Sequence, residues 1–84
     1  MSRHPIGEYL LVEKLQREAN RKTDQWKVYG LHDNLLGLIK WFGRWRQYTF
    51  FPAAGTVFNS TCLLDLKMHL DWVNKEWREA KRNG

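Results

Sequence analysis

The chain is predicted to fold as an α+β domain in the order helix, three strands, helix. Three observations predict this architecture. Apolar residues recur with a helical period at both ends, they alternate with polar residues in the middle, and turn-forming residues separate the runs. The 84 residues suffice for a single domain, residues 1–84, with a modest hydrophobic core.

The first segment, residues 6–21, is predicted to be an amphipathic helix. Leu11, Leu15 and Ala19 recur at intervals of four residues, and charged residues fall on the opposite side. The polar residues 20–24 end the pattern.

The middle segment, residues 25–52, is predicted to be a three-stranded antiparallel β-meander. Residues 25–31, 35–42 and 44–51 have the composition of strands. Pro52 ends the last strand because it cannot donate a hydrogen bond to a neighbouring strand.

The strand register is predicted from the turns. If the turns at 33–34 and 43–44 each have two residues, Trp41 lies opposite both Trp26 and Arg46. One face of the sheet is then almost wholly apolar and aromatic, and the other face carries mainly polar side chains and lysines. A three-stranded sheet with one apolar face needs a helix to cover that face.

The last segment, residues 60–82, is predicted to supply the covering helix. An N-cap is available at residues 59–61. Five apolar residues at helical spacing are expected to face the sheet: Leu63, Leu66, Leu70, Val73 and Trp77.

A second apolar stripe on the same helix comprises Leu64, Met68 and Trp72. Helices on the surface of a monomer usually have one such stripe. Either the N-terminal helix covers the second stripe, or another subunit does. We expect the subunit, and hence a homodimer or a larger closed homo-oligomer.

Composition and charge narrow the range of functions to be considered. Fourteen Lys and Arg residues against nine Asp and Glu residues give a net charge of +5, which favours polyanionic partners. No apolar run is long enough for a membrane span, no signal peptide is evident, and the lone Cys62 is typical of a reducing cytoplasm. No catalytic constellation, metal site or cofactor motif is present, and His32 beside Asp33 is typical of a turn. We therefore expect a cytoplasmic protein that is not an enzyme.

The candidate ligand site centres on residues 41–51, which hold six aromatic residues and two arginines. Arginine offers a planar donor pair for phosphate, and tryptophan a flat face for stacking. The predicted ligand-binding residues are Lys27, Lys40, Trp41, Arg44, Trp45, Arg46 and Tyr48.

Five of these residues also have a structural interpretation, whereas function is favoured for Arg44 and Trp45. Trp41 and Tyr48 are more often core residues than ligand residues in such a pattern, with Arg46 stacked over Trp41. Lys27 and Lys40 are expected side by side, where a bound anion relieves their repulsion or both amino groups extend into water.

Several segments together resemble a family of small phage and prophage proteins. They are LIKW at 38–41, WRQY at 45–48, FFP at 50–52, TVF at 56–58 and CLLDL at 62–66. The resemblance covers about residues 25–74. It implies expression in a bacterial host during infection and a role in host takeover or anti-defence, and it implies no particular activity.

Our leading hypothesis is a non-enzymatic phage-encoded protein that sequesters a nucleotide-type small molecule, such as a cyclic nucleotide defence signal. Two alternatives stay open. One is an inhibitor that docks on a host protein through aromatic and arginine anchors. The other is a protein that binds single-stranded nucleic acid on its sheet.

Overall fold

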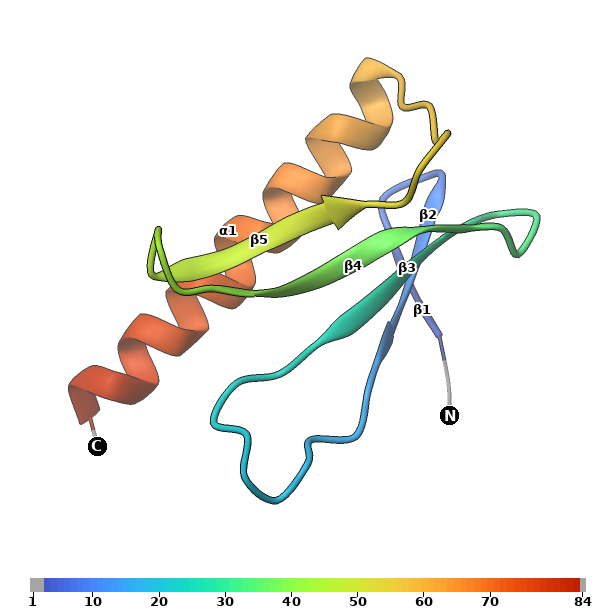
Figure 1. Ribbon diagram of the computed structural model, residues 1–84. Helices are drawn as coiled ribbons and strands as arrows, with labels where there is room; N and C mark the ends of the chain where they lie inside the picture. Colours follow the sequence, from blue (N-terminus) through green and yellow to red (C-terminus); the bar gives the residue numbers. More distant parts are fainter. Residues whose placement is uncertain (1–2, 84) are drawn as a thin grey trace.

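The computed structural model describes residues 3–83 as one helix packed on a five-stranded antiparallel sheet (Figure 1). The strands lie in the sheet in their order along the chain, so every pair of neighbours is a hairpin. The elements are β1 (His4–Ile6), β2 (Leu10–Lys14), β3 (Trp26–Gly30), β4 (Leu35–Phe42), β5 (Gln47–Pro52) and α1 (Ser60–Asn83).

The predicted N-terminal helix over residues 6–21 is wrong. Strands β1 and β2 take its place, and the sheet has five strands rather than three. Leu10 and Val12 are the buried residues of this segment, so its effective period is two and not 3.6. Val12 pairs with Val28 of β3, a residue with no exposed surface. The four-residue spacing was misleading, because Ala19 at its end is exposed in a loop.

The β3–β4 and β4–β5 hairpins each have a turn of four residues, whereas two-residue turns were predicted. In the β4–β5 turn, residues 43–46, Trp45 N donates to Phe42 O and Arg46 adopts a positive φ of 53°. Trp41 consequently pairs with Tyr48 instead of Arg46, and Trp26 pairs with Ile39 instead of Trp41. The predicted register is therefore wrong by two residues. A shift of two keeps most strand side chains on their faces, whereas a shift of one would exchange the faces. The exception is the bulge after Val28, where the register shifts by one more residue, so that Leu36 lies in the core and Leu35 is exposed.

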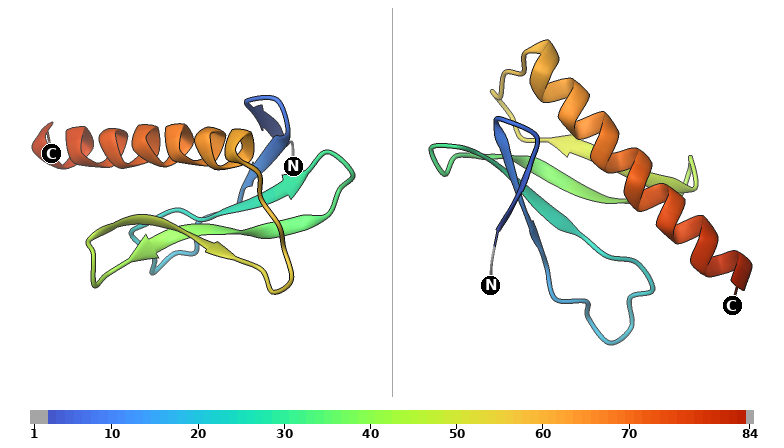
Figure 2. Two further views of the ribbon diagram at one scale, coloured as in Figure 1. Left: turned by 90° about the horizontal axis from the view of Figure 1, so that it is seen from above. Right: turned by 180° about the vertical axis from the view of Figure 1, so that it is seen from behind.

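Helix α1 covers one face of the sheet and leaves the other face bare (Figure 2). Val28 and Ile39 are fully buried beneath the helix, together with Leu66 and Val73 from the helix itself. Leu63, which was predicted to face the sheet, is exposed. The aromatic packing in this layer is edge-on, with 5.3 Å between the ring centres of Trp26 and Tyr48 and 5.5 Å between those of Phe50 and Phe58.

Two local sets of contacts hold the N-terminal part of α1 in position. Asn59 caps its N-terminus, where the Asn59 side-chain oxygen accepts a 2.8 Å hydrogen bond from Cys62 N. At the β1–β2 turn, Gly7 has a φ of 72° and lies against the Asp65 carboxylate, and Glu8 N donates to Asp65 over 3.2 Å. A side chain at Gly7 would overlap Asp65, so the glycine allows the turn to approach the helix.

Candidate functional site

The bare side of the sheet, which we call the open face, carries the outward residues of β2 to β5. Strand pairing places Lys27 opposite Glu13 and Leu38, and places Lys40 opposite Thr49. No helix lies over this face of the sheet (Figure 2), although the Arg3 guanidinium lies 3.7 Å from the centre of the Tyr29 ring and Tyr29 is buried. The open face consists of Leu11, Glu13, Lys27, Tyr29, Leu38, Lys40, Phe42, Thr49 and Phe51.

A row of aromatic rings runs from the open face to the β4–β5 turn. The rings of Phe51 and Phe42 are 5.8 Å apart between centres, and those of Phe42 and Trp45 are 4.9 Å apart, both nearly perpendicular. Lys40 places its amino group 4.7 Å from the centre of the Phe51 ring. Trp45 is 60% exposed, a large apolar area for a turn residue of a small protein.

Four cations lie on the open face or in the adjoining turn: Lys27, Lys40, Arg44 and Arg46. Among the described residues, none of the four takes part in an ion pair. The only acidic side chain among the outward strand residues, Glu13, lies 3.6 Å from Arg3. The open face therefore carries an excess of positive charge beside exposed aromatic surface.

The structure divides the seven predicted ligand residues between the two sides of the sheet. Lys27 and Lys40 lie on the open face, and Arg44, Trp45 and Arg46 lie in the turn beside it. Lys27 and Lys40 are not directly opposite each other, because the register differs from the predicted one.

The other two, Trp41 and Tyr48, face the helix. Trp41 packs against Trp77 with 4.5 Å between ring centres, and Tyr48 is only 3% exposed. The Tyr48 hydroxyl accepts a hydrogen bond from Asp24 N, and burial raises the pKa of this phenol. Trp41 and Tyr48 are therefore core residues.

Phe42 and Phe51 belong to this site but were not among the predicted ligand residues. Their signal was present in the alternation: Phe42 follows Leu38 and Lys40 on the same side of β4, and Phe51 follows Thr49 on β5.

On the helix side, a groove of about 660 Å³ lies between α1 and the strands β1 to β3. Trp26, Tyr48 and Val73 line it, with His69 on the helix. His69 Nε2 is buried and has no hydrogen-bond partner among the described residues, and burial lowers the pKa of this imidazole. The groove also has a charged wall of Lys14, Arg17 and Asp24.

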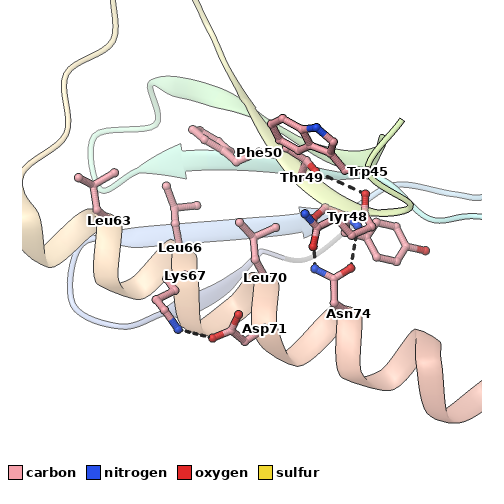
Figure 3. A pocket seen from close by; sticks show the side chains of 11 residues that line it. Trp45, Tyr48, Thr49, Phe50, Leu63, Leu66, Lys67, Leu70, Asp71 and Asn74 are labelled. Atoms are coloured by element: carbon pink, nitrogen blue, oxygen red, sulfur yellow. Dashed lines mark hydrogen bonds and ion pairs between the residues drawn. The ribbon is translucent and has the colours of Figure 1, made fainter. Parts of the chain in front are cut away.

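A smaller cavity of about 320 Å³ lies between α1 and the outer edge of β5 (Figure 3). Here the Asn74 side chain makes the backbone hydrogen bonds to β5 that a neighbouring strand would otherwise make. Tyr48 N donates to Asn74 Oδ1 over 2.7 Å, and Asn74 Nδ2 donates to Tyr48 O over 3.2 Å. A carboxamide thus closes part of an edge that would otherwise be open to strand pairing.

The groups needed for metal binding do not come together in residues 3–83, where no cluster of three His, Cys, Asp or Glu side chains occurs. The one described helix is too polar to cross a membrane. No protein-family model matches the chain, and no match is found among curated proteins or solved structures.

Proposed function

We propose that the chain is a non-enzymatic binding protein that holds single-stranded nucleic acid on its open face. The observation that carries the proposal is the row of Phe51, Phe42 and Trp45 beside four cations without ion pairs in the described chain. Bases stack on aromatic rings with little regard to sequence, and Lys and Arg bind the phosphates between the bases.

An extended strand suits this surface better than a compact nucleotide does. Trp45 and Thr49 border the small cavity at the edge of β5, but neither cavity described above is lined by Lys27, Lys40, Phe42 or Phe51. Small ligands are usually enclosed in concave sites. Trp41 and Tyr48, on which a compact nucleotide was expected to stack, pack beneath the helix. Successive nucleotides of a strand can instead each use one ring of the row.

Fluorescence polarisation with labelled oligo-dT and oligo-U tests the proposal. Oligomers of about 12 nucleotides are long enough to span the site. We expect micromolar affinity that falls with salt at a log–log slope of about −2 to −3, as for three or four phosphate contacts. Lys40→Ala should reduce the slope by about 0.7, and the matched control Lys75→Ala, an exposed lysine on α1, should leave it unchanged.

The competing hypotheses give different results. Binding weaker than about 100 μM at low salt, or an affinity that does not respond to salt, contradicts the proposal. Tight binding of a cyclic nucleotide without oligonucleotide binding would restore the compact-ligand hypothesis. An inhibitor of a host protein would bring down a stoichiometric protein from nuclease-treated bacterial lysate. The role in phage anti-defence stays a prediction from the resemblance.

A further inference from the structure

The outer edge of β5 is closed at Tyr48 and open further along the strand. Both hydrogen bonds between Tyr48 and Asn74 lie on the side of β5 that is turned away from β4. In an antiparallel sheet the backbone groups of alternate residues point to the same side, so those of Phe50 and Pro52 also point away from β4. The next residue agrees with this alternation, because Ala53 N donates to a β4 carbonyl over 2.8 Å.

The open part of this edge presents the N–H and C=O of Phe50 and the C=O of Pro52. In the described part of the chain, no loop or side chain makes a hydrogen bond to these groups. Proline has no N–H, so the edge offers a donor at Phe50 and acceptors at both residues. Backbone donors and acceptors in this order are complementary to the backbone of a further strand.

The cavity of about 320 Å³ beside this edge has room for the side chains of such a strand. Figure 3 shows Leu63, Leu66 and Leu70 directed from α1 toward β5, and Phe50 lines the cavity from the strand side. Leu66 is buried, whereas Leu63 is 54% exposed at the mouth of the cavity. An apolar hollow therefore lies directly beside unpaired backbone groups.

We propose that an extended peptide segment of another protein adds to the outer edge of β5 as a sixth strand, antiparallel to β5. The peptide residue opposite Phe50 exchanges a pair of hydrogen bonds with it, and the residue two positions earlier donates its N–H to Pro52 O. Residues paired across a sheet direct their side chains to the same face. Phe50 faces the helix, so both peptide residues should be apolar and enter the cavity.

The charges at one end of the edge favour an acidic peptide. Arg44 and Arg46 lie in the turn that leads into β5, and neither takes part in an ion pair among residues 3–83. On the helix side of the cavity, Lys67 and Asp71 pair with each other over 2.6 Å and add no net charge. An antiparallel peptide has its C-terminal end beside the turn, so acidic residues there are complementary to the two arginines.

The β5 strand of a second copy is a poorer occupant of this edge. In a symmetric pair centred on Phe50, Pro52 of each copy would lie opposite Tyr48 of the other copy. Tyr48 N already donates to Asn74, so Pro52 O would have no donor. The homo-oligomer expected from the second helix stripe concerns other residues and stays a prediction.

Hydrogen exchange followed by NMR tests the inference. The probe is a synthetic peptide of about seven residues, with capped ends, that alternates leucine and threonine and ends in two glutamates. We expect a dissociation constant of about 300 μM or below. At a peptide concentration about ten times that constant, the Phe50 N–H should exchange about tenfold more slowly. The Tyr48 N–H is the internal control, because it already bonds to Asn74 and should change little.

Two adjacent leucines of α1 provide matched variants. Leu63 and Leu64 are both 54% exposed, but only Leu63 lines the cavity. Leu63→Glu should weaken peptide binding at least about tenfold, and Leu64→Glu should leave it unchanged. Circular dichroism verifies that both variants fold. A methyl group on the peptide nitrogen that donates to Phe50 O should abolish binding, whereas a methyl group on the next nitrogen should not.

The inference does not depend on the proposed function, because Lys27, Lys40, Phe42 and Phe51 do not line this cavity. Peptide binding weaker than about 1 mM overturns it. So does binding that leaves the exchange of the Phe50 N–H unchanged, or an equal loss of affinity in Leu63→Glu and Leu64→Glu. Slower Phe50 exchange at higher protein concentration without peptide would assign the edge to a second copy, and that result also overturns the inference.

Discussion

The two faces of the sheet are built from the same strands and both carry aromatic residues, yet they have different surroundings. Beneath α1, Trp41 and Tyr48 pack edge-on against each other, Trp41 also lies tilted against Trp77, and Tyr48 is buried while Trp41 is partly buried. On the open face, Phe42 and Phe51 also pack edge-on, but nothing described covers them. Aromatic content alone therefore does not distinguish core from site. The position of one helix decides which rings stabilise the fold and which are free for a ligand.

Truncation of neighbouring side chains on β4 should show the largest difference between the faces. Ile39 has no exposed surface beneath the helix, whereas Leu38 is half-buried on the open face. Ile39→Ala should lower the free energy of unfolding by about 3 kcal/mol, because it removes buried surface and leaves a cavity. Leu38→Ala should cost about 1 kcal/mol or less. Urea unfolding at one fixed protein concentration measures both, and equal losses would contradict the assignment of the faces.

A smaller loss is expected at the edge of β5, which α1 closes through Asn74. Asn74→Ala removes both hydrogen bonds to the Tyr48 backbone and should lower the free energy of unfolding by about 2 kcal/mol. The neighbouring Lys75 is exposed, so Lys75→Ala should change the free energy of unfolding by less than about 0.5 kcal/mol. If Asn74→Ala is as mild as the control, the carboxamide does not hold the edge.

The smallest expected difference between the faces is in pH dependence, because among residues 3–83 the one partly buried imidazole is on the helix side. Burial lowers the pKa of His69 below its ordinary value of 6.5, so the unfolded chain takes up this proton at a higher pH than the folded chain does. His69 should therefore lower the stability as the pH falls below about 6.5. Urea midpoints at pH 7.5 and 5.5 should differ less in His69→Gln than in the wild type. An unchanged difference would show that another group is responsible.

The C-terminal helix and the alternation in the middle of the chain were predictable from sequence because each has a strong local period. The pattern around Leu10 to Val12 was ambiguous, since a short apolar run fits either period. Pairing with Val28 decided in favour of a strand, and that contact is between residues far apart in the chain. The length of the β4–β5 turn could not be predicted from the local sequence either, because Arg46 adopts a left-handed conformation that favours glycine.

The candidate site was predictable in part for the same reason. The positions of Lys27 and Lys40 on the outward face follow from alternation alone. The assignment of Trp41 and Tyr48 as ligand residues depended on which face the helix covers. No local pattern contains that information.

The five tryptophan side chains allow the most direct test of the account, because each contributes one indole N–H signal to a two-dimensional NMR spectrum. Trp45 and Trp72 are both largely exposed, but Trp45 lies at the β4–β5 turn against Phe42, whereas Trp72 lies on α1 at the groove beside β1 to β3. On titration with oligo-dT, the Trp45 signal should move in a saturable way while the Trp72 signal stays in place. Movement of the Trp72 signal with an unchanged Trp45 signal would place the ligand on the helix side and contradict the account.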